Sequence, residues 1–233
     1  MGLDIYFHRV KRQFKGDPTK SDDFNAFTEQ VDEDARVTLR KQFDKFLEPL
    51  REAWENSKTN DYWKGIYNER YFHFVEQIRP LIAKNYDWKI RPFTDDGVLE
   101  LPALEELIKK EADAHYEQYN AYFRKVNFLF AYFQNKGKMV DEYYAIVDKE
   151  DVDDIIDRCE KILAAKKGNE WLDEGETIEE FAASLLPTQS GFFFGGTDYD
   201  EYYFWDIIDC LKQMKKYRKL FKGEGTGYVI FSW

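Results

Sequence analysis

The pattern of apolar and polar residues along the chain begins as that of a strand and then changes to that of helices. Residues 3–7 alternate apolar and polar side chains, which is the period of a half-buried strand. From Ser21 to Trp54, apolar residues recur every three or four positions, which predicts a long amphipathic helix. Pro49 lies inside this helix and is expected to kink or end it near residues 46–48, because proline lacks an amide hydrogen and its ring clashes with the preceding turn.

Helical patterns with recognisable ends account for most of the remaining chain. Thr177 is followed three residues later by Glu180, the spacing of a capping box at a helix start. In chain order, the pattern predicts a helix over 61–83 capped at Asn60–Asp61, a helix from Pro102 to about Asn135, a strand over 139–147, a helix over 148–168, a short helix over 177–186, a last helix capped by Thr197 or Asp198, and a strand over 228–233.

Three short strands among five or six helices predict an α+β fold. We expect a mostly helical single domain over residues 1–233, with a small, mainly antiparallel sheet in which the N- and C-terminal strands pair. The segment 84–101 is irregular and contains the turn signal Asp95-Asp96-Gly97. If the chain has a subdomain joint, this segment is where we expect it.

Charge is distributed unevenly along the chain. The formal net charge is −11, which argues against direct nucleic-acid binding. Residues 168–211 contain eleven acidic residues and no Lys or Arg, so this base-free stretch accounts for the whole excess. Bases gather instead in residues 9–15 and 212–222. The base-free stretch is therefore expected to present an acidic surface, whose competing uses are simple solubility or neutralisation of the basic residues 9–15.

Composition and the two cysteines favour a cytoplasmic protein. Aromatic residues make up 18% of the chain, which predicts a well-packed core. No apolar run approaches the roughly 20 residues that span a bilayer, and the acidic Asp4 stands where a secretory signal has basic residues. Cys159 and Cys210 lie among helix-period apolar residues and are expected to be buried thiols.

Two stretches carry a resemblance to a known family. They are Met1-Gly-Leu-Asp-Ile-Tyr6 and the segment 185–203, which reads LLPTQSGFFFGGTDYDEYY. Together they resemble a family of small proteins encoded by phages and bacterial genomes that begin with an MGLD strand and carry a PTxxGFFFGxTxYDEYY motif. The region 142–163 resembles the middle of that family. The resemblance implies a cytoplasmic protein of phage or mobile-element origin, and it assigns no catalytic residue and no cofactor.

The segment 191–203 is the best candidate for a ligand or partner site. Its glycines allow close approach of the backbone to a ligand, and polar groups lie beside aromatic rings. The competing interpretation is structural: the Phe residues anchor a loop in the core while the acids cap the following helix. The candidate residues are Phe192, Phe193, Phe194, Thr197, Asp198, Asp200, Glu201, Tyr202 and Tyr203.

Other motifs point to no particular chemistry. His8, His73 and His115 match no metal-binding spacing, so neither a metal site nor a cofactor is predicted. The glycine-rich segment 223–227 runs from helix to strand and lacks the Lys-Ser/Thr of a phosphate loop. Cys210 lies within a predicted helix, where a core thiol fits better than a nucleophile.

Two functions remain open, and no catalytic residue is assigned for either. The first is a non-enzymatic interaction module whose acidic, aromatic surface binds a basic protein partner or mimics the charge of a nucleic acid. The alternative is a small-ligand-binding or enzymatic pocket around 191–203, completed by Asp4 and Tyr6 of the neighbouring strand.

Overall fold

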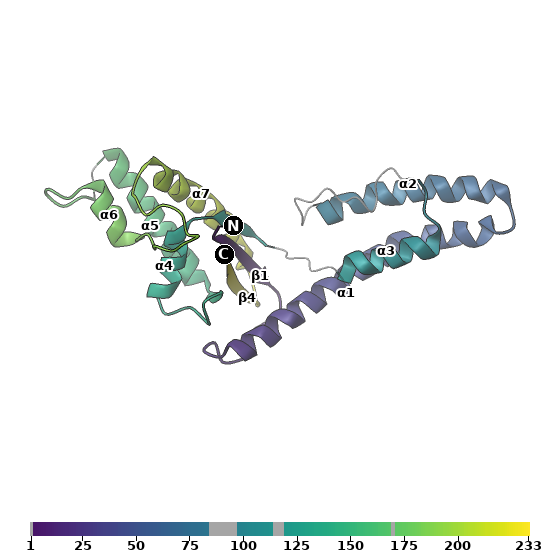
Figure 1. The fold of residues 1–233 in the computed structure, drawn as a ribbon, viewed down its shortest axis with the longest axis horizontal. Helices are drawn as coiled ribbons and strands as arrows, with labels where there is room; N and C mark the ends of the chain where they lie inside the picture. The colour runs from purple at the N-terminus through teal and green to yellow at the C-terminus, as the bar shows by residue number, and fades with distance from the viewer. Residues whose placement is uncertain (1, 84–96, 114–118, 169–170) are drawn as a thin grey trace. The chain divides into compact units, whose positions relative to one another are not determined.

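The structure is a computed structural model that describes residues 2–83, 97–113, 119–168 and 171–233. The described residues form an α+β fold with seven α-helices and a small antiparallel sheet, which confirms the predicted fold class (Figure 1). The elements are β1 (Asp4–Val10), α1 (Ser21–Ser57), α2 (Asp61–Ala83), α3 (Leu101–Asp113), β2 (Ala121–Arg124), α4 (Asn127–Asn135), β3 (Tyr144–Val147), α5 (Lys149–Gly168), α6 (Ile178–Leu185), α7 (Glu201–Tyr217), a short 3-10 helix (Arg218–Leu220) and β4 (Thr226–Ser232).

Contacts between residues group the chain into two compact units. Unit 1 comprises residues 1–27 and 119–233, and unit 2 comprises residues 28–118. Helix α1 thus gives its first turns to unit 1 and the rest to unit 2. The single domain over residues 1–233 stays a prediction, and the joint expected at 84–101 falls mainly on residues outside the described ranges.

Unit 1 is built on a four-stranded sheet with the order β2-β1-β4-β3, in which all neighbours are antiparallel. The predicted pairing of the first and last strands is confirmed. Ile5 of β1 lies opposite Phe231 of β4 on one side and Phe123 of β2 on the other. Because side chains alternate across a strand, these three residues share one face of the sheet.

The two faces of this sheet bury different sets of side chains. The face of Ile5 is covered by helices, among which α5 and α7 pack closely against each other (Figure 1). On the opposite face, Phe24 and Phe27 from the start of α1 meet the edge of Tyr228. His8 stacks on the same tyrosine with the ring centroids 4.6 Å apart. Both faces of the sheet are therefore covered, although the residues of β1 alternate between apolar and polar side chains.

The helix predicted from Pro102 to about Asn135 is wrong in its middle. Helix α3 is described to Asp113, and β2 and α4 follow from residue 121. Ala121 and Phe123 are buried on the sheet while Tyr122 between them is half-buried, so the segment has the period of a strand. Aromatic residues spaced closely along this part of the chain satisfy either period, and pairing with β1 decides between them.

Helix α1 continues past Pro49 to Ser57, so of the two predicted effects of Pro49 the end at residues 46–48 is wrong, and the kink stays a prediction. Pro49 is exposed, whereas Leu47 and Leu50 on either side of it are buried in the core of unit 2. Packing of the apolar face holds the helix together across a residue that lacks one hydrogen-bond donor.

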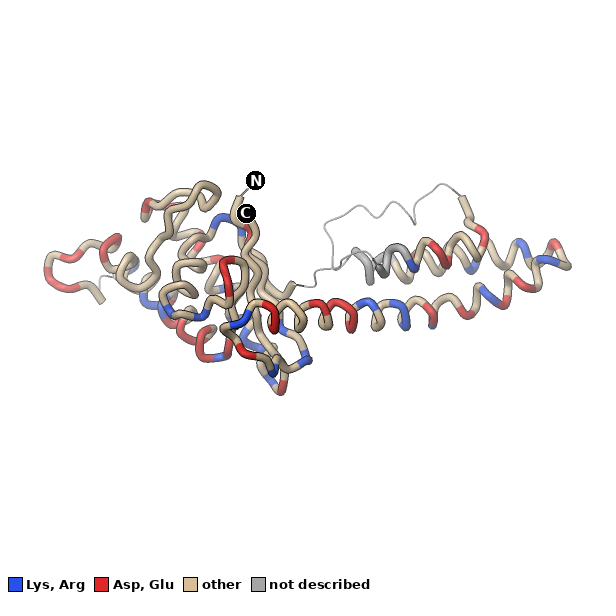
Figure 2. Tube along the Cα trace, turned by 60° about the horizontal axis from the view of Figure 1, so that its bottom comes forward, with Lys and Arg blue, Asp and Glu red and all other residues tan. Residues whose placement is uncertain are grey.

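Unit 2 is helical and has its own core, drawn from α1, α2 and α3. The predicted bounds 61–83 of α2 are confirmed, and Asn60 caps the helix by accepting a hydrogen bond from the amide of Tyr62 at 2.8 Å. Outside the core, charges of both signs alternate along α1 (Figure 2). Arg51, for example, lies 2.8 Å from Glu105 of α3 and 3.0 Å from Asp44. These exposed pairs are typical of a solvated helical surface.

Candidate functional site

The candidate segment 191–203 forms a loop in unit 1 that leads into α7, and a buried amide holds the loop in place. The side chain of Asn127, at the start of α4, is 3% exposed. Its amide nitrogen donates to the carbonyl oxygens of Gly196 at 2.8 Å and Phe194 at 3.3 Å. Its oxygen accepts a hydrogen bond from the amide of Gln189 at 3.3 Å. One side chain thus fixes three points of the loop backbone.

The three phenylalanines of the loop have different surroundings. Phe194 is buried and packs with its ring centroid 5.0 Å from that of Phe130. Phe193 is half-buried, and its carbonyl accepts a hydrogen bond from the amide of Leu3 at 2.9 Å. Phe192, by contrast, is 95% exposed. The structural interpretation therefore holds for Phe194 and does not explain Phe192.

Asp200 caps α7, in place of the predicted Thr197 or Asp198. Its Oδ1 accepts hydrogen bonds from the amides of Tyr202 at 2.9 Å and Tyr203 at 3.1 Å. The predicted capping residues lie too far from the helix, because the chain first turns through Gly195 and Gly196 and reaches α7 at residue 201. The capping box at Thr177 and Glu180 of α6, on the other hand, is confirmed.

A pocket of about 290 Å³ opens between this loop, the start of α4 and the first turns of α7. This volume lies near the lower end of the range that holds small-molecule ligands, roughly 300 Å³ and above. It is lined by Lys125, Asn127, Phe128, Thr188, Gly195, Gly196, Asp198, Asp200, Tyr202, Tyr203 and Asp206.

The structure brings four of the predicted site residues together around the pocket and leaves the others outside its lining. The four are Asp198, Asp200, Tyr202 and Tyr203. The carbonyl of Thr197 accepts a hydrogen bond from the Thr188 hydroxyl at 2.9 Å. The remaining predicted residues outside the lining are Phe192, Phe193, Phe194 and Glu201, and neither Asp4 nor Tyr6 completes the pocket.

Asp206 is the lining residue that sequence reasoning missed and that matters most. Its carboxyl is half-buried, and among the described residues it has no hydrogen-bond or ion-pair partner. Burial, together with the nearby carboxylates of Asp209 and Asp200, raises its pKa to about 6. A carboxyl without a partner in a pocket is a candidate for ligand contact. The sequence could have identified Asp206 from its spacing, because residues four apart, such as Tyr202 and Asp206, lie on the same side of a helix.

The backbone at Lys125 is strained where it passes the pocket. Lys125 has a φ of 61°, the one non-glycine residue with a positive φ in the described ranges. Gly195 lies against it with a φ of 92°, and a Cβ on Gly195 would come within 3.2 Å of the Lys125 Cβ. Strain of this kind is found at sites where the backbone is held for a purpose. Glycine at position 195 allows both the positive φ of the turn and the close approach of the loop backbone to Lys125.

Tyr203 lines the pocket and is a structural residue. Its ring is buried against Phe128, and its hydroxyl donates to the carbonyl of Leu186 at 2.9 Å. Burial raises its pKa well above the ordinary value, so the hydroxyl stays protonated. Tyr203 therefore supplies a wall for a ligand and no ionisable group.

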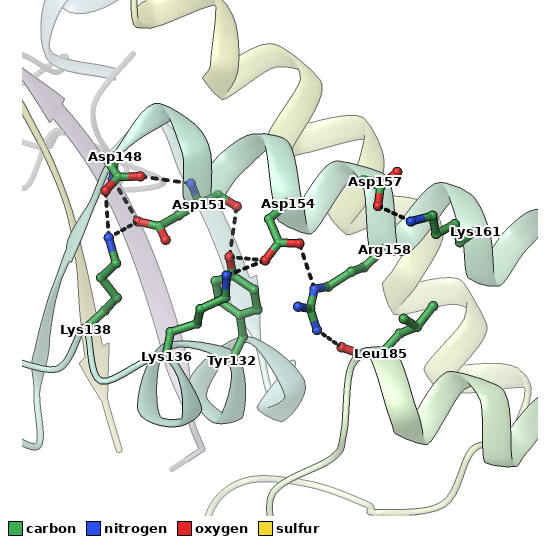
Figure 3. A network of polar contacts seen from close by, with 10 residues as sticks. All are labelled: Tyr132, Lys136, Lys138, Asp148, Asp151, Asp154, Asp157, Arg158, Lys161 and Leu185. Atoms are coloured by element: carbon green, nitrogen blue, oxygen red, sulfur yellow. Dashed lines mark hydrogen bonds and ion pairs between the residues drawn. The ribbon is translucent and has the colours of Figure 1, made fainter.

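A second concentration of charge in unit 1 lies along α5, and its groups satisfy one another (Figure 3). The Lys138 ammonium lies 2.6 Å from Asp148 and 3.0 Å from the buried Asp151. The Tyr132 hydroxyl donates to Asp154 at 2.9 Å, and Arg158 pairs with the same carboxylate at 2.9 Å. Because these charges have partners, the network ties α4 and the turn before β3 to α5 and offers no free group to a ligand.

The remaining candidate motifs have structural surroundings. His73 shares a hydrogen bond with Gln77 at 2.8 Å, and His115 lies outside the described residues. Cys159 and Cys210 are free and buried, as predicted. Within the described ranges, no three His, Cys, Asp or Glu side chains converge as metal ligands would. None of the helices there has the length and apolarity to cross a membrane.

Comparison with known proteins adds no assignment. The chain matches no protein-family model, no curated protein and no solved structure. The resemblance to the phage and bacterial family with the MGLD start therefore stays a prediction from sequence, and the function rests on the geometry of the site.

Proposed function

We propose that unit 1 is a ligand-binding module whose pocket holds a small molecule with a positively charged amino group. The observation that carries this proposal is Asp206, a half-buried carboxyl without a partner whose pKa is raised to about 6. An ammonium or guanidinium group would supply the missing hydrogen bonds and restore the charged form.

The other lining residues fit the same ligand class. Asp198 and Asp200 add negative charge, and Lys125 is the one base among the lining residues. Asp200 uses Oδ1 to cap α7, which leaves its Oδ2 for a ligand. The rings of Phe128 and Tyr202 offer apolar surface and a face for a cation. The lining therefore selects a compact cation with an apolar part.

The experiment is a calorimetric titration with small primary amines and with alcohols of the same carbon skeleton. The wild-type protein is expected to bind an amine and not its alcohol. Asp206→Asn is expected to weaken binding by at least about tenfold, since a charge-assisted hydrogen bond contributes roughly 1.5–3 kcal/mol. Affinity should also fall as the pH drops below 6, where Asp206 becomes protonated.

Glu179→Gln is the matched control, because Glu179 is exposed on α6 and does not line the pocket. Equal affinity of the Asp206→Asn variant and the wild type would refute the proposal, as would equal affinity for amine and alcohol. Asp200→Asn and Tyr203→Phe are poorer tests, because both residues make hydrogen bonds that support the fold.

A second candidate is the interaction module, which binds a basic protein partner through the base-free stretch 168–211. This role is favoured because most acids of the stretch have no ion-pair partner. Among the described residues, Glu201 is the one acid of the stretch in an ion pair, and its partner is Lys166. The segment before α6 carries acidic positions (Figure 2). Arg9, one of the basic residues 9–15, donates to the carbonyl of Gly223 and lies over the ring of Phe221, so it does not depend on these acids for its contacts.

The test of this role is to replace exposed acids and measure binding to a basic protein. Of the acids around α6, Glu180 and Glu176 accept backbone hydrogen bonds that shape the helix start. Glu179 together with Asp173 and Glu174 is therefore the better set to neutralise. Unchanged binding after this change would count against an acidic surface at α6. Cytoplasmic location and a phage origin are further parts of this proposal that rest on sequence alone.

A further inference from the structure

The outer side of α7 carries a stripe of apolar side chains that the fold does not use. Tyr202, Trp205 and Ile208 are 70%, 59% and 52% exposed, respectively. They are spaced three residues apart, so they lie next to one another along one side of the helix. The opposite side of α7 is already buried in the core of unit 1 through Phe204 and Ile207, among others. The stripe is therefore additional to what the fold of unit 1 requires.

The stripe is ordered by its own contacts. The rings of Tyr202 and Trp205 meet edge to face, with their centroids 5.2 Å apart and their planes at 81°. Such a pair is pre-arranged and loses little freedom on binding, which is why Tyr and Trp dominate binding surfaces. Adjacent exposed aromatic and aliphatic residues of this kind mark interaction sites on soluble proteins.

Charge identifies the partner. Asp209 is exposed on the same helix beside the stripe and has no ion-pair partner among the described residues, whereas the exposed Glu201 pairs with Lys166 of α5 at 3.1 Å. No Lys or Arg occurs from residue 168 to 211, so α7 itself carries acids and no base along the stripe before Lys212. An acidic partner would be repelled, whereas a basic one would be steered towards this face and held beside it.

We infer that the outer face of α7, defined by Tyr202, Trp205 and Ile208, docks a basic amphipathic segment of a partner protein. Apolar side chains of that segment cover the stripe, and its Lys and Arg side chains face Asp209. This inference deepens the interaction role given as the second candidate above and rests on it. The stripe shares Tyr202 with the lining of the amine-binding pocket, whereas Trp205 and Ile208 lie outside that lining.

The test uses a synthetic amphipathic peptide of Leu and Lys, labelled with fluorescein, and the same peptide with every Lys replaced by Glu. The wild-type protein is expected to bind the Lys peptide and not the Glu peptide, with an affinity that falls as salt is added. Trp205→Ala is expected to weaken binding at least about tenfold, because an exposed aromatic at the centre of an interface is a typical hot spot.

Phe72→Ala is the matched control, since Phe72 is an aromatic residue of unit 2 that is 56% exposed and lies on helix α2. It should leave peptide binding unchanged. Trp205 makes no contribution to the core, so the Trp205→Ala variant should keep the thermal stability of the wild type and its affinity for amines.

Three outcomes would overturn the inference. Lack of binding to the wild-type protein would refute the interaction role itself. Binding that Trp205→Ala leaves unchanged would refute this face alone. Self-association of the wild-type protein that Trp205→Ala abolishes, without peptide binding, would show that the stripe instead covers a second copy of the chain.

Discussion

Replacement of Asp206 by Asn should make the folded protein more stable at pH 8. The pKa of Asp206 is raised from its ordinary value of 3.8 to about 6, first by burial and then by Asp209 and Asp200. The ionised carboxyl is therefore disfavoured in the folded state relative to the unfolded chain. Asn has nearly the same shape and no charge, so it removes this cost.

The magnitude follows from the difference in pKa. About two pKa units at 1.36 kcal/mol each give an upper limit of about 3 kcal/mol. The carboxyl is only about half-buried, so solvent screening reduces the cost, and we expect a gain of about 1 kcal/mol for Asp206→Asn. A pocket residue that costs stability in the absence of ligand is typical of functional sites.

The dependence on pH has a definite sign. Between the unfolded and folded pKa values, from about pH 4 to pH 6, the folded protein binds more protons than the unfolded chain. The cost of Asp206 is therefore absent below pH 4, grows as the pH rises through this window and is complete above pH 7. Urea denaturation of the wild type and the Asp206→Asn variant at pH 4 and pH 8 measures this cost as a difference in the free energy of unfolding.

The expected result is equal stability of the two proteins at pH 4 and a more stable variant at pH 8. Glu179→Gln serves as a control, because Glu179 is exposed on α6 and is not among the carboxylates that raise the pKa of Asp206. A variant that is less stable than the wild type at pH 8 would show that Asp206 has a stabilising partner and would refute the reasoning.

Three further predictions concern the stability of unit 1. Gly195→Ala should cost about 1 kcal/mol or more in unfolding free energy because of its φ of 92°, whereas Gly196→Ala, with open space around its Cα, should cost little in the same urea titration. Asn127→Ala should cost about 2–3 kcal/mol and abolish amine binding, because it removes the donor to the buried carbonyl of Phe194 and to the carbonyl of Gly196; equal melting temperatures of variant and wild type would contradict this. For Asp154, burial raises the pKa, but hydrogen bonds from Arg158 and others outweigh it and lower the pKa to about 2. Its stabilising effect is thus present above pH 4 and lost as the pH falls towards 2, so Asp154→Asn should be less stable at pH 7 and equal to the wild type near pH 2.

Much of the fold could be predicted from periodicity and helix ends. The bounds of α2, the capping box at Thr177 and the pairing of the terminal strands each follow from local chemistry that the structure preserves. Strand β2 could not be predicted, because its aromatic residues suit a helix as well as a strand and only pairing with β1 decides. The helix through Pro49 likewise depends on packing partners that are distant in the sequence.

The candidate site could be predicted only where its residues follow one another in the sequence. The segment 191–203 contains glycines and acids whose local spacing marks a loop and a helix start, and the pocket lies there. Lys125 and Asn127 line the pocket from far earlier in the chain. Their contribution arises from a turn with a positive φ and from a buried amide, and neither leaves a local pattern in the sequence.

Native mass spectrometry of the wild-type protein and the Asp206→Asn variant, each purified gently from its own cells, tests the central claim most directly. The account predicts a small retained mass on the wild-type protein that is released when the pH is lowered to 5 and is missing from the variant. A bare polypeptide mass for both proteins, or the same small mass on both, would contradict a cation-binding pocket at Asp206.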